Sequence, residues 1–167
     1  MANLEDLYRE IILDHYRSPR NRGELPVPPA VRAEGFNPLC GDEITLFLDV
    51  EDDTVADVRI AAQGCSISQS SASMMSVAIK GRPIAEVRDL ARQFKAMMTI
   101  HESSLGGDGS DRDGADGGHE PVAVDEKALG DLAALQGVVK FPPRIKCATL
   151  AWITLAQGLD DAEAATA

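Results

Sequence analysis

Cysteine is scarce in this sequence. The 167 residues contain three cysteines, Cys40, Cys65 and Cys147, and an odd number excludes a fully paired disulfide framework. Aromatic residues are also few, at 4% of the chain, whereas the apolar fraction of 44% is ordinary. A chain of this length and composition is expected to form one domain with a hydrophobic core.

Long apolar runs and targeting signals are missing as well. No stretch of about 18 apolar residues occurs, so no transmembrane helix and no membrane partner are expected. The first six residues, MANLED, lack the basic start and the apolar stretch of a signal peptide. These absences predict a cytoplasmic protein whose thiols are kept reduced.

Basic residues are in deficit, since 16 lysines and arginines face 27 acidic residues and the formal net charge is −11. The electrostatic field of such a negative chain repels a phosphate backbone unless basic side chains cluster strongly. The sequence has one small basic cluster, Arg17, Arg20 and Arg22. No nucleic-acid partner is therefore expected. The charge favours instead a protein partner with a basic surface.

The hydrophobic patterns predict an α+β fold. Ile44, Leu46 and Leu48 recur at every second position, as in a strand buried mainly on one face. Strands are predicted over residues 31–36, 44–50 and 55–62, and helices over residues 3–16, 66–80, 83–98, 125–136 and 145–159. The expected architecture is a single domain over residues 1–167, with a small antiparallel three-stranded sheet and helices packed on one face.

Two segments are predicted to stay outside this packing. Residues 101–120 contain six glycines and six acidic residues, and they cannot bury enough apolar surface to offset the entropy lost on ordering. We expect a mobile acidic, glycine-rich insertion there. We also expect a loose C-terminal tail over residues 160–167.

The three cysteines and one carboxylate have settings suited to metal ligands. Cys40 and Asp42 are two residues apart at the start of an extended segment, so their side chains point to the same side. Cys65 precedes a predicted helix, whose N-terminus favours a thiolate, and Cys147 lies beside cationic residues that favour one too. Three thiolates and a carboxylate make the four ligands of a tetrahedral zinc ion. No Cys-x-x-Cys pair occurs. The residues alone therefore also allow the alternative that the three cysteines are ordinary buried side chains with no metal.

Four segments carry further information. They read DHYRSPRNRG over residues 14–23, NPLCGD over 37–42, GCSISQSS over 64–71 and RIKCA over 144–148. In this order they resemble the family of iron–sulfur cluster assembly scaffolds related to IscU and the N-terminal domain of NifU. The insertion, and Lys146 where IscU-type scaffolds carry a histidine, resemble the SufU branch. The chaperone-binding motif of IscU-type scaffolds is also altered, to FPPRIK over residues 141–146.

The resemblance implies a zinc-dependent sulfurtransferase. Members of this branch accept sulfur from a persulfide on the cysteine desulfurase SufS and pass it towards the SufBCD assembly complex. Matched by position, Cys40, Asp42, Cys65 and Cys147 would bind zinc, and Cys40 would accept the sulfur. Arg144 matches a family arginine linked to activity.

Two alternatives use the same ligands. A scaffold protein would assemble a [2Fe–2S] cluster on the three thiolates and Asp42, since sulfur-rich sites accept either metal. In a docking protein, zinc would be a structural staple only. Lys146 and the insertion favour the sulfur relay.

Overall fold

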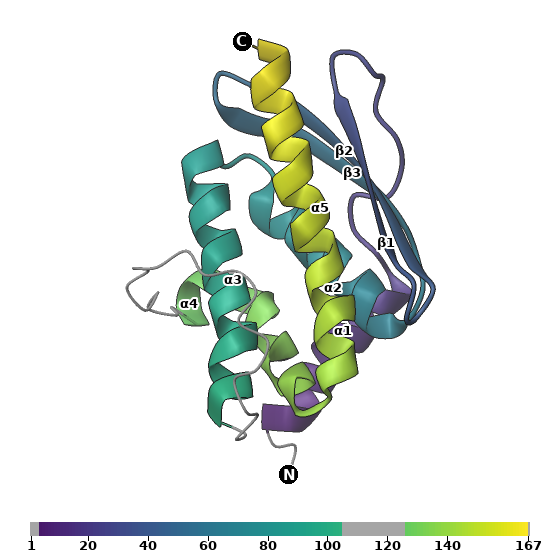
Figure 1. Ribbon diagram of the computed structural model, residues 1–167, viewed down its shortest axis with the longest axis vertical. Helices are drawn as coiled ribbons and strands as arrows, with labels where there is room; N and C mark the ends of the chain where they lie inside the picture. Colours follow the sequence, from purple (N-terminus) through teal and green to yellow (C-terminus); the bar gives the residue numbers. More distant parts are fainter. Residues whose placement is uncertain (1–3, 105–125, 167) are drawn as a thin grey trace.

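The computed structural model describes residues 4–104 and 126–166, in which helices cover one face of a three-stranded sheet (Figure 1). Helix α1 (Leu4–Arg17) is followed by strands β1 (Val31–Asn37), β2 (Asp42–Glu51) and β3 (Thr54–Gln63). Helices α2 (Ser66–Ile79) and α3 (Ile84–Ser104) come next. The last part contains the short helix α4 (Glu126–Leu129), the 3₁₀ helix η1 (Gly130–Lys140) and helix α5 (Pro142–Thr166).

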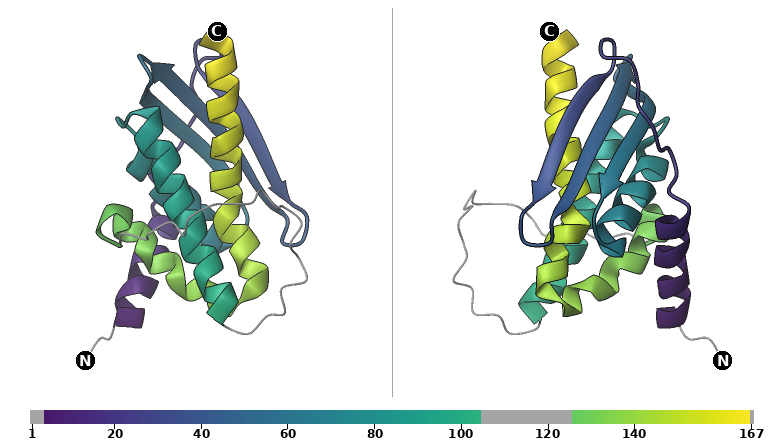
Figure 2. Two further views of the ribbon diagram at one scale, coloured as in Figure 1. Left: turned by 60° about the vertical axis from the view of Figure 1, so that its left-hand side comes forward. Right: turned by 90° about the vertical axis from the view of Figure 1, so that its right-hand side faces the viewer.

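The strands form an antiparallel sheet in the order β1-β2-β3. Ile44, Leu46 and Leu48 of the central strand are buried, as expected for a strand with one face on the core. Figure 2 shows α2, α3 and α5 gathered on the same side of the sheet. The predicted fold class is therefore confirmed.

Helix α5 crosses the sheet at close range. A Cβ atom on Gly158 would lie 2.8 Å from Cδ1 of Leu48, and one on Gly35 of β1 would collide with Oγ1 of Thr154. Glycine permits both approaches because it has no side chain. The packing fixes α5 against the β1–β2 hairpin, which matters because both elements carry predicted ligands.

Helix α1 is anchored on α2 and η1 by polar contacts. His15 is buried, with Nδ1 2.8 Å from Oγ of Ser73 in α2 and Nε2 3.3 Å from Oδ2 of Asp131 in η1.

Among the helices in the described part of the chain, none combines the length and the apolar character needed to cross a membrane.

The start of the predicted insertion is helical. Helix α3 continues to Ser104, beyond the predicted end at residue 98, so residues 101–104 are not part of a loose segment. Adding a residue to an existing helix costs far less than starting one, so α3 extends beyond its buried methionines, Met97 and Met98. The rest of the predicted insertion, residues 105–120, lies outside the described residues.

The prediction of a loose tail is wrong for residues 160–166, because α5 continues to Thr166. Nη2 of Arg88 lies 2.9 Å from Oδ1 of Asp160 and 3.1 Å from Oε1 of Glu163, and Ala162 is buried. Arg88 lies in α3, far from the tail in the sequence, so the local sequence of the tail did not reveal these ion pairs. The helix predicted over residues 125–136 also differs, since most of it is the 3₁₀ helix η1.

Candidate metal centre

The β1–β2 hairpin brings Cys40 and Asp42 together at one end of the sheet. Asn37, the last residue of β1, pairs with Asp42, the first residue of β2, and residues 38–41 connect them. Gly41 has a φ of +68°, in the left-handed region that favours glycine. Cys40 is exposed in this loop, whereas Asp42 is fully buried. The hairpin therefore offers one accessible thiol and one buried carboxylate.

Cys147 reaches the same point from the start of α5. Its Sγ lies 3.3 Å from Sγ of Cys40, and the residue is fully buried. One ligand atom from each of Cys40, Asp42 and Cys147 lies within 4.8 Å of the other two, a spacing at which one metal ion can be shared. Three of the four predicted ligands are thus brought together by elements far apart in the sequence.

Cys65 lies beside this group but is not a member of it. It is the N-cap residue of α2, where its Sγ accepts a hydrogen bond from the amide of Ser68 at 3.5 Å. The amide of Cys65 donates to Oδ1 of Asp42 at 3.0 Å. Gly64, with a φ of +140°, permits this contact, because a Cβ atom there would collide with the Asp42 carboxylate. The role of Cys65 as a fourth ligand stays a prediction.

Hydrogen bonds keep the buried Asp42 carboxylate charged. Burial acts to raise the pKa of Asp42, but the hydrogen bond from the Cys65 amide opposes it. Hydrogen bonds from the side chains of Cys147, Ser68 and Cys65 act in the same lowering direction. Together they outweigh burial and hold the pKa of Asp42 below its usual value.

The Cys147 thiol shows the opposite behaviour. Burial raises its pKa first, and hydrogen bonds with Asp42 and Cys40 raise it further. The prediction that neighbouring cations favour a Cys147 thiolate is therefore wrong without a metal, because Lys146 is exposed and burial outweighs the local charge. A bound cation reverses this balance, since a coordinated thiol loses its proton.

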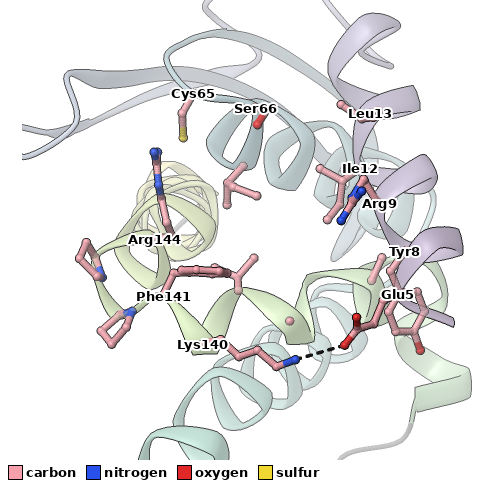
Figure 3. Close-up of a pocket in the computed structure, with 16 residues that line it drawn as sticks. Glu5, Tyr8, Arg9, Ile12, Leu13, Cys65, Ser66, Lys140, Phe141 and Arg144 are labelled. Atoms are coloured by element: carbon pink, nitrogen blue, oxygen red, sulfur yellow. Dashed lines mark hydrogen bonds and ion pairs between the residues drawn. The ribbon is translucent and has the colours of Figure 1, made fainter. Parts of the chain in front are cut away.

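Arg144 is an exposed residue in the first turn of α5, and its guanidinium points towards Sγ of Cys65 (Figure 3). The electrostatic interaction with Cys65 raises the pKa of Arg144, and hydrogen bonding with the sulfurs of Cys147 and Cys65 acts in the same direction. Arg144 thus supplies a permanent positive charge to the sulfur atoms on this side of the centre.

Asn37 is a site residue that the sequence did not single out. It is 5% exposed, and its Nδ2 lies 3.4 Å from Oδ2 of Asp42 and 3.7 Å from Sγ of Cys147. The available signal was an asparagine directly before Pro38 at the end of a strand. Such a residue is usually interpreted as a turn former, so its contacts with two ligands were not evident.

A groove of about 960 Å³ opens beside Cys65 and Arg144 (Figure 3). Its walls come from α1, the start of α2, η1 and the start of α5. Most of the lining is apolar and includes Ile12, Ile67 and Phe141. The groove is therefore an apolar depression next to the candidate metal centre.

The charged residues of this groove are mainly cationic. Nζ of Lys140 lies 3.2 Å from Oε1 of Glu5, so these two charges compensate each other. Arg9 and Arg144 line the groove as well, and Arg9 has no ion-pair partner among the described residues. The groove thus has an excess of positive charge on a chain whose net charge is −11.

The donor atoms fit a specific group of metals. Two sulfurs and a carboxylate oxygen suit zinc, or iron in an iron–sulfur cluster. The fold and these donors define the class of protein: a small α+β domain with a cysteine–carboxylate group at one end of its sheet that could hold a metal ion. The chain belongs to the family of NifU-like N-terminal domains, whose family model matches residues 7–148.

Individual relatives support this assignment. The zinc-dependent sulfurtransferase SufU of Bacillus subtilis (strain 168) is 42% identical over 158 residues, which cover 95% of this chain and 92% of that protein. The iron–sulfur cluster assembly scaffold protein IscU of Streptococcus pyogenes serotype M1 is 35% identical over 159 residues, which cover 95% of this chain and 86% of that protein. A solved structure of FiSufU from Fervidobacterium islandicum AW-1, assigned as a cluster assembly scaffold for the SUF system, has a TM-score of 0.72 at 28% identity and covers 92% of this chain and 97% of that one. The predicted family is confirmed.

Asp42→Asn should destabilise the metal-free protein by about 1–3 kcal/mol at neutral pH, because the amide of Cys65 then faces a group with less acceptor capacity. Because the pKa of Asp42 is lowered by folding, the advantage of the wild type is fully present above the unfolded pKa of about 4. It is lost as the pH falls through the folded pKa. Urea unfolding with a chelator between neutral pH and strongly acidic pH measures this difference.

Glu43→Gln, which removes an exposed carboxylate next to Asp42, is the matched control and should change the stability little at any of these pH values. An Asp42→Asn penalty that stayed constant down to the lowest pH would contradict a stabilising charge at Asp42.

Proposed function

We propose that this chain is a zinc-dependent sulfurtransferase that works in the cytoplasm. It takes sulfur from the persulfide of the cysteine desulfurase SufS and passes it to the SufBCD iron–sulfur assembly complex. The observation that carries the proposal is the exposed thiol of Cys40 next to the buried pair Asp42 and Cys147. The similarity to SufU over nearly the whole chain supports it.

Zinc would be held by Cys40, Asp42 and Cys147, with Cys65 as the fourth ligand. When bound, zinc would keep the coordinated sulfurs deprotonated without redox chemistry of its own. The buried ligands, Asp42 and Cys147, are fixed by the hairpin and by α5. Cys40 lies in the exposed loop, so it is the sulfur that a partner can reach.

The sulfur step is a thiol–persulfide exchange at Cys40. The Cys40 thiolate attacks the terminal sulfur of the donor persulfide, and a new bond forms between Sγ of Cys40 and that sulfur. The bond to the donor cysteine breaks, and the donor leaves as a thiolate with the bonding electron pair. No external oxidant or reductant is needed, and the same exchange with an acceptor thiolate hands the sulfur on.

Arg144 contributes positive charge to this exchange. Its guanidinium interacts with the sulfurs of Cys65 and Cys147, so it lies at the candidate centre. A persulfide has a lower pKa than a thiol and carries negative charge, which a fixed guanidinium stabilises by hydrogen bonding. We assign Arg144 the role of stabilising the sulfur anions during transfer.

A second function uses the same residues. The scaffold proteins among the relatives, such as IscU of Streptococcus pyogenes, favour assembly of a [2Fe–2S] cluster on these ligands. The donor set does not separate the two functions, because sulfur-rich sites accept both metals. The metal content of the isolated protein distinguishes the two functions.

Protein isolated under anaerobic conditions should contain about one zinc per chain and have no visible absorption, because zinc has a filled d shell. Elemental analysis and a visible spectrum of the same sample measure both properties. An iron–sulfide chromophore in place of zinc would overturn the sulfurtransferase and favour the scaffold.

Cys40→Ala should abolish the stimulation of a cysteine desulfurase by this protein, because the attacking sulfur is missing. Sulfide release from cysteine in the presence of a reductant measures the stimulation, and zinc is quantified in the same preparation. Leu39→Ala, at the exposed neighbouring position, is the matched control and should keep most of the stimulation. Full stimulation by a zinc-loaded Cys40→Ala protein would instead indicate a structural zinc.

The groove beside the centre supports docking of the desulfurase. Its apolar walls and the cations Arg9 and Arg144 suit a partner segment with apolar side chains and a carboxylate. The net charge of −11 favours a basic partner surface at long range, whereas the groove favours an acidic segment at contact. We therefore assign the groove to a local segment of the desulfurase.

Arg9→Glu should raise the concentration needed for half-maximal stimulation of the desulfurase by about tenfold, because it places a like charge against the acidic segment. The maximal stimulation and the zinc content should not change. Arg32→Glu on β1, which also reverses an exposed arginine but lies outside the groove, is the matched control. Equal effects of the two substitutions would exclude the groove as the docking site.

A further inference from the structure

The carboxamide of Asn37 makes contacts at both of its ends. Its Oδ1 accepts a hydrogen bond from the amide of Leu39 at 3.2 Å. Its Nδ2 faces Oδ2 of Asp42 at 3.4 Å and Sγ of Cys147 at 3.7 Å. At 5% exposure the side chain is shielded from water, so these contacts are the ones that satisfy its polar atoms.

The orientation of this carboxamide follows from its partners. The amide of Leu39 can only donate, so the atom that faces it must be the oxygen. The nitrogen then faces a carboxylate and a sulfur, which both accept. An N–H donor suits both acceptors, the Asp42 carboxylate and the Cys147 sulfur, whereas an oxygen at this point would repel the carboxylate.

The two ends act on different ligands. The bond to Leu39 fixes the loop immediately before Cys40, while Nδ2 links Asp42 of the hairpin to Cys147 of α5. Asp42 has its other oxygen on the amide of Cys65, so each carboxylate oxygen has its own donor. One side chain therefore connects the exposed ligand loop with both buried ligands.

We propose that Asn37 is the positioning residue of the metal centre: it holds the Cys40 loop with one end of its carboxamide and aligns Asp42 and Cys147 with the other. It acts through the ligands and does not itself bind the metal. The inference rests on the proposed function in one respect, namely that this centre binds a divalent metal. Partners that orient ligands in this way are worth about 10- to 100-fold in metal affinity.

Asn37→Asp tests the donor end alone. It has nearly the same shape and keeps an oxygen for the amide of Leu39, but it places a second carboxylate oxygen against Asp42 and Cys147. Asn21→Asp is the matched control, because the carboxamide of Asn21 is also part-buried and donates to Oγ of Ser76 at 3.0 Å, away from the centre. Asparagine and aspartate both tolerate the left-handed backbone of Asn21, where φ is 54°.

The zinc affinity of each folded protein is measured by competition with a chromogenic chelator, and the visible spectrum is recorded after substitution with cobalt(II). Asn37→Asp should bind zinc at least about 10-fold more weakly than the wild type and shift the sulfur-to-cobalt absorption bands. Asn21→Asp should match the wild type within about twofold in affinity and leave the bands unchanged.

Urea unfolding of the metal-free proteins separates positioning from a merely structural role. A structural role would lower the stability of Asn37→Asp while the zinc affinity of its folded form and its cobalt spectrum stayed as in the wild type, and that result would overturn the proposal. If Asn37→Asp does not fold, Asn37→Ser decides, because its hydroxyl still accepts from Leu39 but is too short to reach Asp42 and Cys147. Wild-type zinc affinity in a folded Asn37→Ser protein would likewise overturn it.

The outcomes also separate this inference from the proposed function. Cobalt(II) and zinc probe the donor set directly, so a difference between wild type and Asn37→Asp supports the positioning role whichever metal the isolated protein carries. An iron–sulfide chromophore in the isolated wild type would overturn the sulfurtransferase alone. Equal affinities in wild type and Asn37→Asp would overturn the role of Asn37 alone.

Discussion

The centre depends on a buried carboxylate that stays charged. Asp42 is fully buried, and a carboxylate removed from water costs several kcal/mol unless donors compensate it. The donors come from three places: Asn37 at the end of β1, the amide of Cys65 before α2, and Cys147 in α5. All three donors contact the carboxylate oxygens of Asp42, so the hairpin, the start of α2 and the start of α5 meet at this residue. Gly64 and the glycine contacts of α5 with the sheet make that convergence sterically possible.

The same contacts place two ligands in electrostatic conflict. The charge on Asp42 is stabilised by accepting hydrogen bonds, and one of its donors is the Cys147 thiol, whose pKa is thereby raised. A second anion in this buried space is disfavoured, because burial and the charge on Asp42 both oppose ionisation of Cys147. A divalent metal held by Asp42 and Cys147 would compensate both charges, so its binding would be coupled to loss of the Cys147 proton. The metal-free site therefore holds Cys147 as a thiol, ready to exchange its proton for a metal ion.

Local sequence predicted those parts of the structure that depend on local patterns. The period of two in Ile44, Leu46 and Leu48 gave the central strand, and the spacing of Cys40 and Asp42 placed both at one end of it. The local patterns did not predict the features that depend on contacts between residues far apart in the sequence. Arg88 of α3 holds the end of α5, which the composition of residues 160–167 did not indicate. Burial of Cys147 by the folded chain reversed the effect expected from its cationic neighbours. Asn37 contacts Leu39 and Asp42 within the hairpin, but its contact with Cys147 depends on the packing of α5, which the local sequence did not indicate.

Exposure divides the work among the ligands. Of the three cysteines, Cys40 is exposed, Cys65 is half-buried and Cys147 is buried. A sulfur carrier must present a thiol to a donor and later to an acceptor, so its reactive sulfur has to lie where both can approach. A metal site must also retain its ion when that thiol is engaged, which requires other ligands that do not move. Asp42 and Cys147 would meet the second requirement because the hairpin and α5 bury them, and Cys40 would meet the first because it is exposed in the hairpin loop. In the proposed function, the separation of a fixed, buried pair from an exposed thiol would make sulfur transfer compatible with metal retention, and a symmetric centre of equally buried thiolates would lack this separation.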